Sequence, residues 1–217
     1  MRFNKIDINE ASLLASAFVK STLGSYIPDG KCFTVSYPLS IHLENNGFKN
    51  SLSTGKFKFG SPEQKDHFWI AFEDEDKTII DPTIKQFFTE MPDLYIGKRP
   101  TEYTIESTPY ESWFKEVYKS WIGNFEFRAQ LQLLSSQEYF DIILDINVKA
   151  AIIINNDIEL KNTNMHVSQK LDQYLYGIYC ILINYTDQEL TKFRNLLGYD
   201  KLVARLNNEY SKRHITN

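Results

Sequence analysis

Apolar residues recur along the chain at two different spacings. In four short runs of the N-terminal half, aromatic and β-branched residues alternate with polar ones, which predicts β-strands. These runs are residues 48–60, 66–73, 76–81 and 94–106. Elsewhere the apolar residues follow helical spacing, which predicts helices at 8–23, 32–46, 137–154, 168–184, 187–197 and 199–211, with a further helical pattern over 109–134.

This distribution predicts an α+β fold made of two unlike parts. Residues 1–107 are expected to form N-terminal helices packed on a small antiparallel sheet, and residues 108–217 an all-helical extension. No flexible linker marks the boundary, so the two parts either fold separately or share one core. Within the second predicted helix, Pro38 removes an amide donor, so that helix either kinks there or begins after Cys32.

Composition and charge narrow the class of protein. Hydrophobic residues make up 42% of the chain and charged residues 24%, as in ordinary soluble domains, and the net charge of −4 with scattered basic residues argues against a nucleic-acid partner. No apolar run is long enough to cross a membrane, and the N-terminus lacks a secretory pattern. Two cysteines do not form a disulfide framework. We therefore expect a cytoplasmic protein with no membrane partner.

Three residues have the types and order that nucleophilic cysteine chemistry requires. Cys32 follows a glycine-containing loop and opens a predicted helix, where unpaired amides favour a thiolate. His67 opens one predicted strand and Asp81 ends the next, across the acidic turn 73–76. In an antiparallel hairpin the start of one strand lies beside the end of its partner, so the carboxylate is expected within reach of the imidazole.

The motifs around these residues resemble those of a known superfamily. Gly30-Lys31-Cys32 opens a helix, Asn46-Gly47-Phe48 ends it, and His67-Phe68-Trp69 and Asp81-Pro82-Thr83 follow on strands. This order is similar to the core of the transglutaminase-like branch of the papain-like cysteine proteases. The resemblance covers roughly residues 20–90, and it departs from the usual pattern at Lys31, where an aromatic residue is common.

The resemblance implies acyl transfer through a Cys-His-Asp triad. Cys32 would attack an amide or ester carbonyl, His67 would hold the thiolate and protonate the leaving group, and Asp81 would orient the imidazole. The product would be that of a peptidase, amidase, glutamine deamidase or transamidase acting on a protein or peptide, without a cofactor or metal. The Cys32 amide is the expected oxyanion donor, and further candidates for oxyanion or substrate contacts are Ser25, Tyr26 and Trp69.

Other interpretations stay open at the level of the sequence. The chain would be an inactive adaptor if it keeps the fold but binds a protein partner through its helical half. Arylamine acetyltransferases have a similar Cys-His-Asp order, but their Arg-Gly-Gly before the cysteine is absent here. Cys180 and His42 are expected to be structural, and no zinc or phosphate-binding motif is present.

Overall fold

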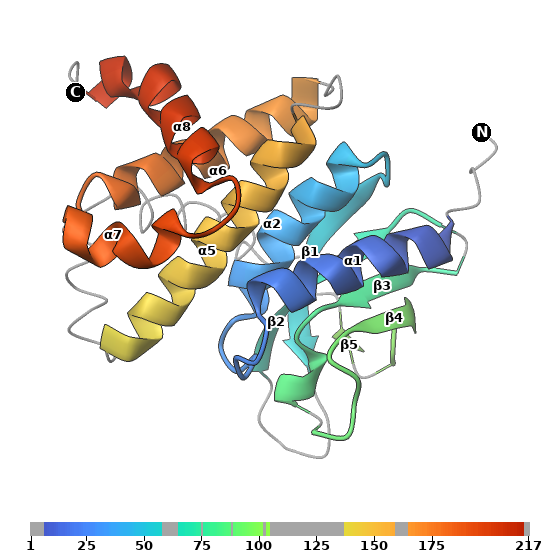
Figure 1. The fold of residues 1–217 in the computed structure, drawn as a ribbon. Helices are drawn as coiled ribbons and strands as arrows, with labels where there is room; N and C mark the ends of the chain where they lie inside the picture. Colours follow the sequence, from blue (N-terminus) through green and yellow to red (C-terminus); the bar gives the residue numbers. More distant parts are fainter. Residues whose placement is uncertain are drawn as a thin grey trace. The chain divides into compact units, whose positions relative to one another are not determined.

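The computed structural model describes residues 7–57, 65–74, 76–87, 89–101, 103–104, 137–158 and 165–214. Over these residues the fold is α+β, as the sequence predicts. The chain divides into two compact units with bounds 1–113 and 114–217. The described strands all belong to the first unit, and the described part of the second unit is helical (Figure 1).

The first unit contains an antiparallel sheet with strand order β4-β3-β2-β1-β5. The strands are β1 (Asn50–Phe57), β2 (Lys65–Phe72), β3 (Thr78–Asp81), β4 (Tyr95–Lys98) and β5 (Tyr103–Thr104). The single strand predicted over 94–106 is therefore two strands, β4 pairing with β3 at one edge and β5 with β1 at the other. Pro100 lies between them, where its missing amide donor breaks no ladder.

Two helices accompany this sheet, α1 (Ile8–Thr22) and α2 (Cys32–Asn45). α2 contacts β1 and β2, and α1 contacts α2 (Figure 1). α2 begins at Cys32 and continues through Pro38, so it does not start later. Every residue from Phe33 to Leu43 is buried, and this packing outweighs the cost of an interior proline, about 3 kcal/mol.

Specific contacts fix α2 on the sheet at both ends of the helix. Near its start, the Phe33 and Phe68 rings meet edge to face at 5.0 Å, and the Ser36 hydroxyl donates to the carbonyl of Phe68 over 3.4 Å. Near its end, the Ser40 hydroxyl donates to the Asn50 side-chain oxygen over 2.7 Å. These contacts fix the position of Cys32, in the first turn of α2, relative to the sheet.

A small apolar cluster lies on the face of β2 and β3 opposite to the face that carries Phe68. Trp69, Ile79 and Ile84 are buried in it, and Phe87 and Met91 pack against them. Ile84 belongs to a short 3₁₀ helix, η1 (Ile84–Gln86). The segment after Asp81 therefore folds back over the sheet face that carries His67 and Trp69.

The second unit contains α5 (Gln137–Ile158), α6 (Met165–Leu182), α7 (Asp187–Arg194) and α8 (Tyr199–His214). α6 contacts α5 and α8, and α8 also contacts α5 and α7. The buried Tyr174 hydroxyl lies 3.1 Å from both the carbonyl and the side-chain oxygen of Asn147, which joins α6 to α5.

Among the described residues, no helix combines the length and apolar character needed to cross a bilayer. The helical pattern over 109–134, with Trp113 and Trp121, lies outside the described residues.

Candidate functional site

His67 and Asp81 form a buried pair on neighbouring strands. Nε2 of His67 lies 2.7 Å from Oδ2 of Asp81, and both side chains are fully buried. In the ladder Ile70 pairs with Ile80, so Asp81 is one step on, across from Trp69 and diagonal to His67. The carboxylate is within reach of the imidazole, as the hairpin predicted. The two residues are diagonal neighbours and do not pair directly across the ladder.

The second oxygen of the Asp81 carboxylate is also bonded. Oδ1 accepts the backbone N–H of Thr83 over 2.9 Å and lies 3.4 Å from the Thr83 hydroxyl. An aspartate that accepts a bond from the residue two positions on is the usual opening of an Asp-x-Thr turn. Asp81-Pro82-Thr83 therefore both turns the chain after β3 and fixes the carboxylate that faces His67.

Cys32 is the third member of this group. The Cys32 side chain forms a hydrogen bond with His67 and also interacts with it electrostatically. Because Nε2 of His67 is bonded to Asp81, we assign the hydrogen bond with Cys32 to Nδ1. Burial of His67 opposes its charged form, but Asp81 and then Cys32 favour that form, and together they raise the pKa of His67 to about 10. The Cys32 side chain is half-buried, so solvent reaches it while His67 and Asp81 are enclosed.

The loop before Cys32 is held by Lys31. The Lys31 ammonium donates to the carbonyl of Ile27 over 2.7 Å and to that of Asp29 over 3.1 Å, and only 5% of the residue is exposed. Burial lowers the pKa of Lys31, against the opposing charge of Asp29. Gly30 has φ +69°, a left-handed conformation that favours glycine. Lys31 thus serves to close the turn that leads into α2.

The three further candidates lie in different surroundings. Ser25 and Tyr26 line a pocket of about 720 Å³ between the end of α1, the loop that follows it and residues 85–94, and Cys32 is not among the lining residues. Trp69 is fully buried in the cluster with Ile79 and Ile84, and its ring centroid is 6.0 Å from that of His67. This placement makes Trp69 a support beneath the imidazole and leaves no part of it exposed to a substrate.

Two residues beside the imidazole were missed in the sequence. The Phe87 ring meets the His67 ring edge to face at 4.8 Å, and Nε2 of Gln86 lies 3.2 Å from Nδ1 of His67. Both belong to the turn after Asp-Pro-Thr, which the sequence shows only as polar and aromatic residues following a loop motif. Their short separation from Asp81 in the sequence could have indicated this contact, because a chain that turns back after a strand can return to the same sheet face.

The remaining candidates carry no comparable cluster. Cys180 is buried in α6, where burial raises the pKa of its thiol, and the ring of His42 stacks on Phe18 at 5.1 Å. No group of metal-ligating side chains is found among the described residues. The side chains of His166 and His214 lie outside them.

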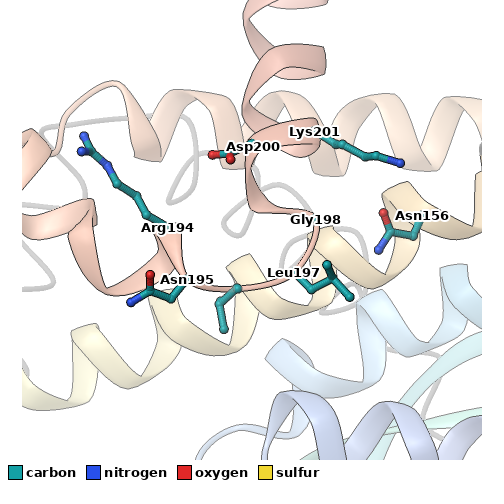
Figure 2. Close-up of a pocket in the computed structure, with 8 residues that line it drawn as sticks. Asn156, Arg194, Asn195, Leu197, Gly198, Asp200 and Lys201 are labelled. Atoms are coloured by element: carbon teal, nitrogen blue, oxygen red, sulfur yellow. The ribbon is translucent and has the colours of Figure 1, made fainter.

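A pocket of about 680 Å³ lies in the helical unit, where α7 gives way to α8 (Figure 2). Arg194 and Lys201 line it, but Figure 2 shows their side chains pointing away from one another. Arg194 is also paired with Asp187 at 2.9 Å. This pocket therefore has basic residues without a convergent site for an anion.

Comparison with known proteins leaves the geometry as the sole guide to function. A scan against models of protein families, a search of curated proteins and a search of solved structures each returned no match.

Proposed function

We propose that the protein is a cysteine-dependent acyl-transfer enzyme in which Cys32 is the nucleophile, His67 the base and Asp81 the group that orients the base. The observation that carries the proposal is the continuous chain of contacts from the half-buried Cys32 through His67 to the buried Asp81. A nucleophile, a base and an orienting carboxylate in this order form the minimal unit for acyl transfer.

The setting of the three residues also supports a papain-like, transglutaminase-like core for the first unit. Cys32 is the first residue of a helix that packs on an antiparallel sheet, and the other two lie on adjacent strands of that sheet. The first amides of α2 have no partner within the helix, and no acidic residue occupies its first turn. This end of the helix favours negative charge at the sulfur and offers the Cys32 backbone N–H to an oxyanion.

The reaction follows from these positions. The proton on the Cys32 sulfur passes to Nδ1 of His67, and the sulfur attacks the carbonyl carbon of an amide or ester. When the tetrahedral intermediate collapses, His67 returns the proton to the leaving group and a thioester remains. Water or an amine then attacks the thioester and restores the thiol, giving hydrolysis or transamidation of a protein or peptide substrate.

An activated ester tests the acyl-enzyme without knowledge of the natural substrate. On mixing with p-nitrophenyl acetate, the wild-type protein should release a burst of p-nitrophenol stoichiometric with protein and carry an acetyl group on Cys32, located by peptide mass spectrometry. Adding hydroxylamine should speed turnover if amines are accepted. Cys32→Ala should give no burst, and His67→Ala should acylate at least about 100-fold more slowly, the usual contribution of a general base.

Cys180→Ala is the matched control, because it removes the other thiol of the chain and should keep the full burst. An acetyl group found elsewhere than on Cys32, or equal acylation of wild type and His67→Ala, would overturn the proposal. In that case the adaptor interpretation is favoured, and Cys32→Ala would leave the binding of a protein partner intact.

A further inference from the structure

The side chain of Gln86 joins the turn after Asp81 to the loop before Cys32. Its Oε1 accepts the backbone N–H of Gly30 over 3.3 Å. Its Nε2 lies 3.2 Å from the hydroxyl of Thr83 and 3.2 Å from Nδ1 of His67. The hydrogen-bonding contacts of Gln86 thus reach the cysteine loop, the aspartate turn and the histidine together.

The contact with Gly30 determines which end of the amide faces His67. Because a backbone N–H needs an acceptor, Oε1 points toward Gly30, and the two hydrogens of Nε2 point toward Thr83 and His67. An amide N–H bonds to Nδ1 only while that nitrogen keeps its lone pair. This is the neutral imidazole, with its single hydrogen on Nε2 donated to Asp81.

The Cys32 thiol needs the same lone pair. When the sulfur gives its proton to Nδ1, the new Nδ1–H faces the N–H of Gln86, and two donors repel. Turning the amide over would let Oε1 accept from Nδ1–H, but its NH₂ group would then face the N–H of Gly30. The amide therefore cannot satisfy Gly30 and a protonated His67 at the same time.

We infer that Gln86 is a positioning residue whose N–H donates to the neutral form of His67, so that it opposes protonation of Nδ1 and weakens the thiolate–imidazolium pair. The inference rests on the proposed function, since it concerns the same Cys-His pair. Among the described residues, Asp81 on β3 and Cys32 on α2 are the ionisable groups that act on the imidazole, and both favour the proton. Gln86 is the neutral group that opposes them.

Titration of His67 by long-range ¹H–¹⁵N correlation NMR tests the inference with the thiol removed. In the Cys32→Ala protein, adding Gln86→Leu should move the His67 midpoint to higher pH, because an N–H donor to the neutral ring is lost. The change corresponds to about fivefold in the protonation equilibrium, the effect of one neutral hydrogen bond. Gln86→Glu should move it further, since its carboxylate still accepts from Gly30 and now also accepts from Nδ1–H.

Alkylation of Cys32 by iodoacetamide provides the second measurement, in the protein with its thiol. At pH 6, Gln86→Leu should react faster than wild type, by up to about fivefold. Gln188→Leu is the control, because Gln188 is an exposed glutamine in the helical unit and the same chemical change there should alter neither measurement.

A His67 midpoint that stays fixed or falls in Gln86→Leu would overturn the inference, because the added carboxylate of Gln86→Glu raises the midpoint in either case. If Gln86→Leu fails to fold, Gln86→Met takes its place, because it also lacks the N–H donor, adds no charge and keeps an unbranched stem. Because the NMR titration uses protein without Cys32, a midpoint that rises while Cys32 shows no acylation by p-nitrophenyl acetate would reject the proposed function and keep the role of Gln86. A midpoint that does not rise, with Cys32 acylated, would reject the role of Gln86 and keep the proposed function.

Discussion

Nε2 of His67 lies 2.7 Å from Oδ2 of Asp81, diagonally across the β2–β3 ladder, with both side chains sealed from solvent. A histidine and a carboxylate that are both fully buried stabilise a fold only as a pair, because each desolvated charge needs the other. The pair is therefore a structural element of the sheet as well as the candidate catalytic base and its orienting group.

Asp81→Asn should destabilise the first unit strongly. The substitution leaves His67 buried without its carboxylate, and breaking a buried pair on one side costs about 3–5 kcal/mol. Urea denaturation at pH 7 measures this loss. Lys49→Met removes the exposed pair between Lys49 and Glu73, which are 2.6 Å apart, and should change the unfolding free energy by less than about 1 kcal/mol. Equal effects of the two substitutions would contradict the buried pair.

The free energy of unfolding should fall as the pH rises from neutral to alkaline. The folded-state pKa of His67 is raised from 6.5 to about 10, so the folded protein binds the proton more tightly than the unfolded chain. The resulting stabilisation is fully present below pH 6.5 and is lost as the pH rises through about 10. Urea midpoints measured between pH 6 and 10 should decline in wild type, and the decline should be smaller in His67→Gln. A steeper decline in the variant would contradict the assignment to His67.

Lys31→Met should disturb the cysteine loop while keeping the buried aliphatic stem. The change removes the donors to the carbonyls of Ile27 and Asp29, at about 1–3 kcal/mol in unfolding free energy for the acceptors left without them. Because those bonds shape the turn into α2, acylation of Cys32 should also slow severalfold. Lys20→Met, at an exposed position on α1, is the control and should leave both measurements unchanged.

The two cysteines should differ clearly in accessibility. Cys32 is half-buried at the start of α2, whereas Cys180 is 5% exposed and burial raises the pKa of its thiol. Iodoacetamide added to the native protein at pH 7.5 should label Cys32 well before Cys180, as read by peptide mass spectrometry. In urea concentrated enough to unfold the chain, the two alkylation rates should converge. Faster native labelling of Cys180 would contradict the packing of α6.

The sequence by itself determined the α+β class, the order of most elements and the approach of His67 to Asp81. These follow from local information: alternation of apolar residues marks β2 and β3, and a short acidic turn joins them into a hairpin. Glycine and the polar run before Cys32 likewise predict a helix after this loop, while Pro38 left its first residue open between Cys32 and a later position. Periodicity and turn chemistry are properties of neighbouring residues, so a single chain displays them.

Only the tertiary structure decided the features that depend on distant contacts. α2 continues through Pro38 because its surroundings bury it, and residues 94–106 divide into β4 and β5 because two different strands offer them an edge. The approach of Gln86 to His67 depends on η1 folding back over the sheet, where Ile84 packs on Trp69. Packing energy between segments far apart in the chain selects these arrangements, and no local pattern of residues encodes it.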